Sequence, residues 1–261
     1  MRFTVLNMRF LPGRVLRSVA AALLALVAAG GFGASAEVPY DRLQVKADRF
    51  FSQHEWAQAA ATYYQMLEAR PDVPATYGKA IVANAVRGDT VAEMQLMVKA
   101  LNSKVPFDSV LSRVKSTSFE LGKSNLYGDF LLRVREAYPW MRRPIDNYLL
   151  RYYTYRMDGA KMMEYSRMML QGAPGNRGFL MAYARGAMLC GRDDEGLRAY
   201  REILSGAPDD YDVLLALGNY YALPPSEDKV LAVEYLSRAN EINPTPFVTA
   251  LLEKLTPPKK H

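Results

Sequence analysis

Apolar residues return along this chain at offsets of three, four and seven positions, the spacing of a single stripe on an α-helix. Each stripe ends shortly before a proline, and these prolines recur at intervals of 35, 33, 35, 34 and 36 residues: Pro71, Pro106, Pro139, Pro174, Pro208 and Pro244. The position five residues before each proline is always apolar: Met66, Leu101, Val134, Met169, Ile203 and Ala239. Proline lacks the amide donor and clashes with the preceding turn, so each one marks the end of a helix.

A glycine interrupts four of these units about seventeen residues before the proline: Gly88, Gly122, Gly159 and Gly191. Glycine can adopt the backbone angles of a tight turn between two helices. Alternating β-branched residues, the signal of a strand, are absent from the sequence. We therefore predict an all-α chain of repeated units, each a helix, a short turn, a second helix and a proline. A closing helix is expected after the last proline, around Phe247, Leu251 and Leu252.

This unit resembles the helix pair of the tetratricopeptide repeat family, which is 34 residues long. The matching residues are Phe50, Trp56, Ala59, Tyr63, Leu67 and Pro71 in the first unit, Gly191, Tyr200 and Pro208 in the fifth, and Leu214, Leu217, Gly218, Tyr221, Ala232 and Pro244 in the sixth. The pattern departs at Ser118, where a large apolar residue is expected, and around Pro224, where the turn is two residues longer. The resemblance covers roughly residues 40–244. It implies a right-handed α-solenoid of about six repeats that stack and share a continuous core.

The first 36 residues have the three parts of a secretory signal. Four arginines and no acidic residue precede or enter the apolar run Val19–Ala29, and the small triplet Ala34-Ser35-Ala36 follows. We predict a signal peptide over 1–36, cleaved before Glu37, a helical repeat domain over 37–256 and a disordered tail over 257–261. An uncleaved membrane anchor is the alternative, but the apolar run is short against the roughly 20 residues that span a bilayer. The expected location is the bacterial periplasm or the exterior, with membrane contact only through the leader.

Charge and composition exclude several classes of function. The net charge is +6, but the leader alone carries +4, so the repeat domain is nearly neutral and a nucleic-acid partner is not expected. One cysteine and two histidines leave no disulfide framework and no thiolate or histidine metal centre, so neither a metal nor a cofactor is expected. The sequence also contains no zinc-protease, phosphate-loop or dinucleotide-binding motif.

The residues that could carry catalysis have structural interpretations. Cys190 is expected to be a buried, inert thiol at the end of a first helix, and His54 an ordinary polar residue in a turn. The acidic runs Asp193-Asp194-Glu195 and Asp209-Asp210 stand where helices begin, so they are expected to cap the exposed amides there. We therefore predict no catalytic residue and a chain that is not an enzyme.

A candidate ligand groove follows from the resemblance, because ligands of that family lie along the first helices, on the side away from the core. The implied groove residues are Lys79, Arg113, Asn147, Tyr148, Arg151, Tyr155, Arg185 and Asn219. A ladder of cations with interleaved tyrosines can bind an acidic or C-terminal peptide. The alternative is a solvated helix face that happens to carry arginines. The family's carboxylate clamp is not reproduced, because Ala83 stands where an asparagine is needed after Lys79.

Other aromatic and sulfur-containing residues near this groove are expected to pack in the core: Leu149, Leu150, Tyr152, Tyr153, Met162, Met163, Met168 and Met169. The sequence thus predicts an exported, non-enzymatic scaffold or adaptor that binds a protein or peptide segment in its concave groove, in the cell envelope. The alternative is a carbohydrate-binding envelope protein built on similar helices. A hydrolase without recognisable motifs is a third, disfavoured hypothesis.

Overall fold

The computed structural model describes residues 39–256, and this range contains helices and no strand. The helices are α2 (Tyr40–Ser52), α3 (Trp56–Ala69), α4 (Pro74–Val86), α5 (Thr90–Asn102), α6 (Phe107–Glu120), α7 (Ser124–Ala137), the 3-10 helix η1 (Pro139–Met141), α8 (Arg142–Arg156), α9 (Gly159–Gly172), α10 (Arg177–Leu189), α11 (Asp193–Gly206), α12 (Tyr211–Tyr221), α13 (Lys229–Ile242) and α14 (Pro246–Leu255). The leader over 1–36 and the tail over 257–261 lie outside the described residues, so both stay predictions.

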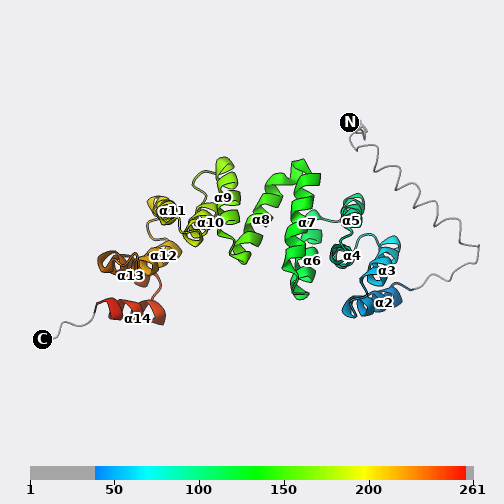
Figure 1. Ribbon diagram of the computed structural model, residues 1–261, viewed down its shortest axis with the longest axis horizontal. Coiled ribbons are helices and arrows are strands. Elements are labelled where there is room, and N and C mark those ends of the chain that lie inside the picture. The colour runs from blue at the N-terminus through cyan, green and yellow to red at the C-terminus, as the bar shows by residue number, and fades with distance from the viewer. Residues whose placement is uncertain (1–38, 257–261) are drawn as a thin grey trace, which may run out of the picture.

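The helices form six consecutive antiparallel pairs, from α2–α3 to α12–α13, and α14 closes the series. The six prolines follow the second helices of the pairs, as predicted. In Figure 1 the pairs stack side by side into an elongated arc, with the second helices along its outer edge and most first helices beneath them. The predicted α-solenoid is confirmed, and the closing helix occupies the predicted position.

Residues in the left-handed backbone region make the turns inside most pairs. Gly88, Gly122 and Gly191 have φ of 74°, 66° and 68°, as the sequence predicts. The prediction is wrong for Gly159, which begins α9, while Met157 has the positive φ of 55°. Gly159 is needed for a different reason: a Cβ atom there would lie 2.7 Å from the carbonyl oxygen of Gly186, so α9 and α10 could not approach as closely.

The turn residue Met157 offers a small test of the fold. Its side chain is exposed, so little packing is lost on truncation, whereas a left-handed conformation costs a non-glycine residue about 1–2 kcal/mol. We expect Met157→Gly to raise the free energy of unfolding by about 1 kcal/mol in urea titrations. Gly191→Met should lower it by a similar amount, and a destabilised Met157→Gly protein would contradict this account.

The apolar core is divided into two clusters, so the prediction of one continuous core is wrong. The first cluster extends from Leu43 to Tyr165 and includes Ala182, and the second extends from Leu180 to Ala232. The division lies at α10: Ala182 belongs to the first cluster, whereas Leu180, Met181 and Ala184 belong to the second. The residues that were expected in the core are buried or half-buried, as predicted: Leu149, Leu150, Tyr152, Tyr153, Met162, Met163, Met168 and Met169.

An ion pair between a half-buried arginine and a fully buried glutamate joins the second helices of two neighbouring units. Arg133 of α7 donates from Nε and Nη2 to Oε2 of Glu93 on α5, at 3.1 and 2.6 Å. Glu93 is fully buried, and its other oxygen, Oε1, has no hydrogen-bond partner among the described residues. Burial raises the pKa of the Glu93 carboxyl group above its usual value, and Arg133 acts in the opposite direction. The pair fixes α5 against α7 as long as both charges are present.

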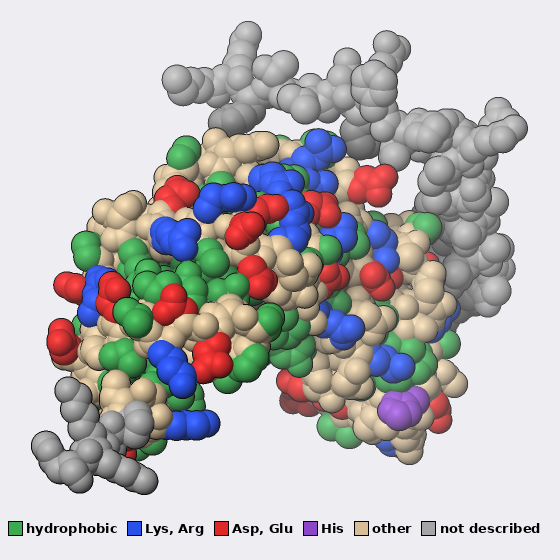
Figure 2. Space-filling model, turned by 60° about the vertical axis from the view of Figure 1, so that its left-hand side comes forward, with side chains coloured by type: hydrophobic (Ala, Val, Ile, Leu, Met, Phe, Trp, Pro, Cys, Tyr) green, Lys and Arg blue, Asp and Glu red, His purple; other side chains and the backbone are tan. Residues whose placement is uncertain are grey.

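The surface of the C-terminal half carries charges of both signs. Figure 2, in which the C-terminal helices come forward, shows acidic and basic side chains interspersed around an apolar area. Exposed apolar residues of the last pair and of α14 include Leu223, Val230 and Phe247. This face of the described domain therefore has no field of a single sign that would attract nucleic acid.

Candidate binding groove

A groove with a volume of about 410 Å³ lies between α8 and α10, the first helices of the fourth and fifth pairs. Its lining residues are Asn147, Leu150, Arg151 and Thr154 from α8, and Asn176, Gly178, Phe179, Met181, Ala182 and Arg185 from α10 and its start. Asn176 begins α10 as its N-cap, because its Oδ1 accepts a hydrogen bond from the amide of Phe179 at 3.2 Å. We call this the inner groove.

The inner groove brings together three of the eight predicted site residues: Asn147, Arg151 and Arg185. Both arginines are exposed, and neither forms an ion pair within the described part of the chain. No Asp or Glu lines the groove. Arg185 lies near Tyr200; burial raises the pKa of Tyr200 above its usual value, and Arg185 acts in the opposite direction. Two guanidinium groups with no compensating carboxylate make the inner groove a site for anionic groups.

The four predicted cations occupy two different positions along their helices, about one helical turn apart. Lys79 and Arg113 stand nine residues before the left-handed residue that ends their first helix, whereas Arg151 and Arg185 stand only six before theirs. Arg151 and Arg185 are therefore equivalent to each other, but not to Lys79 and Arg113.

The first two predicted cations lie outside the inner groove. Lys79 of α4 forms an ion pair with Asp48 of α2, at 2.8 Å between Nζ and Oδ1, so its charge is already compensated. Asp48 also accepts a hydrogen bond from the Tyr63 hydroxyl at 2.9 Å, and burial together with this carboxylate raises the pKa of Tyr63. Arg113 of α6 is exposed, and its Cβ atom lies where α4 and α6 approach each other at Gly78.

The remaining predicted residues contact other parts of the chain. The Tyr148 hydroxyl donates to Oδ1 of Asp108 at 2.9 Å, and the ring of Tyr155 packs on that of Phe119 at 4.8 Å between centroids. Both contacts join α8 to α6, so these tyrosines link neighbouring repeats. Asn219 is half-buried on α12, away from the inner groove.

Comparisons with known proteins give distant similarities. No family model matches the sequence, and no curated protein matches it. Among solved structures, PilF of Pseudomonas aeruginosa is 16% identical with a TM-score of 0.45, covering 83% of this chain and 97% of that one. PilW, a type IV pilus biogenesis factor, is 15% identical with a TM-score of 0.46, covering 82% and 98%. A tetratricopeptide repeat protein from Parabacteroides merdae is 14% identical with a TM-score of 0.41, covering 83% and 98%.

Since all three TM-scores are below 0.5, the assignment depends on the repeat that this chain itself contains. Six stacked helix pairs follow one another at nearly constant intervals, three of them turning at a left-handed glycine. The chain is a tetratricopeptide-type α-solenoid. Its inner groove lies between two first helices, on the side of the solenoid where the resemblance places ligands.

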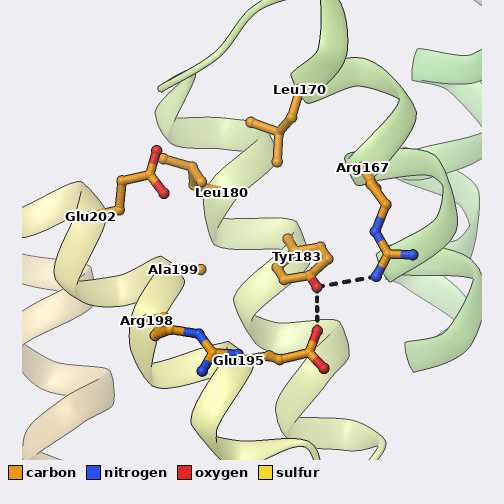
Figure 3. Close-up of a pocket in the computed structure, with 8 residues that line it drawn as sticks. All are labelled: Arg167, Leu170, Leu180, Tyr183, Glu195, Arg198, Ala199 and Glu202. Atoms are coloured by element: carbon orange, nitrogen blue, oxygen red, sulfur yellow. Dashed lines mark hydrogen bonds between the residues drawn. The ribbon is translucent and has the colours of Figure 1, made fainter.

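A second groove, which we call the outer groove, opens on the other side of α10, with a volume of about 370 Å³ (Figure 3). Its lining residues are Arg167, Leu170, Leu180, Tyr183, Glu195, Arg198, Ala199 and Glu202. At its centre Arg167 donates to the Tyr183 hydroxyl at 3.2 Å, and that hydroxyl donates to Oε2 of Glu195. Arg192 donates to the other oxygen of Glu195. The hydrogen bond from Tyr183 and the charge of Arg192 lower the pKa of Glu195. The carboxylate of Glu195 is therefore already bound by side chains of this chain.

This outer groove was missed in the sequence, because Glu195 was expected to cap a helix. The N-cap of α11 is Arg192, and no side chain accepts a hydrogen bond there. Asp193 instead accepts from the Tyr220 hydroxyl at 3.0 Å. The prediction does hold for Asp210, which caps α12 by accepting from the amide of Val213 at 3.2 Å.

Three further observations concern chemistry within residues 39–256. Cys190 is exposed at the C-cap of α10, where the helix ends, so the prediction of a buried thiol is wrong. No group of three or more His, Cys, Asp or Glu side chains is placed to hold a metal ion. No helix in this range is long and apolar enough to cross a membrane.

Proposed function

We propose that this solenoid is a non-enzymatic scaffold of the bacterial cell envelope that holds an acidic segment of a partner protein in its inner groove. The observation that carries the proposal is the pair Arg151 and Arg185, two guanidinium groups that line one groove without a carboxylate. A guanidinium group binds a carboxylate through two parallel hydrogen bonds, and such charge-assisted bonds are the stronger kind.

The rest of the lining suits a polypeptide. Leu150, Phe179 and Met181 offer apolar contacts, while Asn147 and Asn176 carry amide groups that can bond to peptide carbonyls. An extended segment keeps its backbone groups available for such bonds, because it has no internal ones. A volume of about 410 Å³ accommodates a few residues. A longer segment would continue along the neighbouring first helices.

The envelope location is supported by the leader. We propose export followed by cleavage before Glu37. After expression with a C-terminal tag, the purified protein should begin at Glu37 and be recovered from the periplasmic fraction or the medium. An intact leader on protein that remains in the cytoplasm would contradict this part of the proposal.

The binding function is tested by charge reversal in the inner groove. We expect Arg151→Glu and Arg185→Glu each to weaken retention of an acidic envelope protein at least about tenfold, and the double variant to abolish it, because attraction becomes repulsion. Arg198→Glu, an exposed position in the outer groove, is the matched control and should retain the partner. Equal losses in the three single variants would show that the partner responds to overall charge. Capture of a glycan in place of a protein would favour the carbohydrate-binding alternative.

A steric variant tests the same groove without changing its charge. Gly178 lines the groove near the start of α10, and a Cβ atom there would meet only Oδ1 of Asn176, at 3.4 Å. We expect Gly178→Leu to fold normally, with unchanged circular dichroism, and to occupy the groove so that partner binding falls at least about tenfold. Normal binding by the folded variant would remove the groove from the proposal.

A further inference from the structure

The acidic and basic residues of α2 lie on different flanks of the helix. Its buried residues Leu43 and Ala47 face the core, and Asp48 points toward α4, where it pairs with Lys79 at 2.8 Å. In a helix of 3.6 residues per turn, Asp41 lies within about 20° of Asp48 around the axis. The acidic flank of α2 is therefore the one next to α4.

Three basic residues, Arg42, Lys46 and Arg49, lie on the flank that faces away from α4, which we call the basic flank. They are four and three positions apart, so they fall within about 60° of one another around the axis. All three are exposed, and none forms an ion pair within residues 39–256. Nζ of Lys46 and Cζ of Arg49 lie 5.7 and 5.4 Å from the ring centroid of Phe50, so one aromatic ring contacts both cations. The basic flank thus presents three uncompensated positive charges.

The basic flank lies at a free end of the solenoid. The first helix of the described residues is α2, and it stands at one end of the arc in Figure 1. In the described part of the chain, no earlier second helix packs against α2 in the way that α3 packs against α4. Val45, whose side chain is 72% exposed, lies beside the three cations. This end of the solenoid therefore offers an open, positively charged surface.

We propose that the basic flank of α2 binds an anionic lipid surface. This interaction is independent of the inner groove, and it adds a membrane contact to the one expected through the leader. Each basic residue near an anionic bilayer strengthens binding by about fivefold, so three of them favour it over a neutral bilayer by about a hundredfold. Val45 supplies an exposed apolar side chain that can enter the headgroup region beside the charges.

The position of the leader in the sequence supports a lipid surface as the binding partner. Ten residues, 30–39, separate the apolar run Val19–Ala29 from the start of α2. Even a fully extended chain of ten residues spans only about 35 Å. If the leader enters the bilayer on export, as proposed, α2 emerges within about this distance of the lipid headgroups.

Other macromolecules fit the basic flank less well. Tight binding to nucleic acid involves about six to ten phosphate contacts, whereas this flank offers three basic residues on a nearly neutral domain. A stable protein interface has a closely packed apolar centre, and Val45 is the one large apolar residue that is exposed on α2. A bilayer requires neither feature, because its mobile headgroups adapt to the charges of the helix.

The test is co-sedimentation of the protein recovered after export with two kinds of vesicle. One kind contains phosphatidylcholine alone, and the other contains equal parts of phosphatidylcholine and phosphatidylglycerol. At low ionic strength, we expect binding to the anionic vesicles to be at least about tenfold tighter than to the neutral ones. The variant Arg42→Gln/Lys46→Gln/Arg49→Gln should lose this preference, and an unchanged preference would overturn the proposal.

A matched control removes three exposed, unpaired basic residues elsewhere in the described solenoid: Lys104→Gln/Lys123→Gln/Arg198→Gln. It changes the net charge by the same amount as the α2 variant, and it should retain the preference for anionic vesicles. Equal losses in the two triple variants would also overturn the proposal, because the vesicles would then respond to overall charge.

An environment-sensitive fluorophore locates the contact. It is attached at position 45 in the variant Val45→Cys/Cys190→Ser, or to the natural Cys190, which is exposed at the end of α10. Anionic vesicles should shift the emission to the blue at position 45 and leave it unchanged at position 190. No shift at position 45, or an equal shift at both positions, would contradict a contact through α2.

A protein partner for the basic flank is a separate outcome. If anionic vesicles are not bound, but the α2 triple variant loses an acidic protein that the matched control still captures, the flank contacts a protein and the lipid proposal fails. None of these variants changes Arg151 or Arg185, so failure of the lipid proposal leaves the proposed function of the inner groove in place.

Discussion

Replacing Arg133 by methionine should lower the free energy of unfolding by about 3–5 kcal/mol, measured by urea denaturation at pH 8. The substitution leaves the fully buried carboxylate of Glu93 without the guanidinium group that donates two hydrogen bonds to it. Methionine fills part of the space of the arginine stem, so most of the loss arises from the uncompensated charge. The double variant Glu93→Met/Arg133→Met removes that charge and should recover most of the stability.

The loss in Arg133→Met should depend on pH in a defined direction. Burial raises the pKa of Glu93 above its ordinary value of 4.5, and Arg133 is the group that opposes this rise. A carboxyl group with a raised pKa in the folded state favours folding when it is protonated, and this contribution is lost as the pH rises through the folded pKa. The stability gap between wild type and Arg133→Met should therefore widen from pH 4 to pH 8. A constant gap would indicate that lost packing, not charge, causes the destabilisation.

A second large effect is expected at Gly78, where α4 and α6 pack most closely. A Cβ atom at this position would lie 2.5 Å from Cβ of Arg113 and 2.8 Å from its backbone carbonyl carbon, and backbone cannot yield without moving a helix. We expect Gly78→Ala to lower the free energy of unfolding by about 2–3 kcal/mol, although alanine is the better helix former.

The matched control for Gly78→Ala is Gly206→Ala in α11, where a Cβ atom would meet nothing within 4 Å. Gly206→Ala should leave the stability unchanged or raise it by up to about 1 kcal/mol, and thermal unfolding of the two variants in parallel measures the difference. If both variants gained stability, the close approach of α4 and α6 would not be a feature of the protein in solution.

The positions of the helices could be predicted from the sequence because the signals are local. Proline ends a helix whatever lies around it, and a glycine such as Gly88 allows the left-handed turn at its own position. Gly159 shows the limit of this reasoning. It lies close to the same place in its repeat as the turn glycines, but it is required by the backbone of Gly186, which only the stacked helices bring next to it.

The candidate site was only partly predictable for a related reason. The pairing of Lys79 with Asp48 depends on how α2 lies against α4, so the sequence could not show that this cation is compensated. The difference between the two earlier and the two later cations did leave a signal in the sequence, because each stands at a definite distance from a repeat proline. Counted from the repeat proline before each first helix, Lys79 and Arg113 stand eight and seven residues on, whereas Arg151 and Arg185 stand twelve and eleven residues on. The outer groove had no such signal, because Arg167, Tyr183 and Glu195 come from three different helices.

The central claim is that an acidic partner segment lies between α8 and α10, on the inner side of the solenoid. It is tested most directly by attaching a nitroxide to the captured segment and measuring the paramagnetic broadening of amide signals in the isotope-labelled protein. The account predicts strong broadening around Asn147, Arg151, Gly178 and Arg185, and none around Arg198 and Glu202 in the outer groove. Broadening centred on the outer groove, or spread evenly over the molecule, would contradict it.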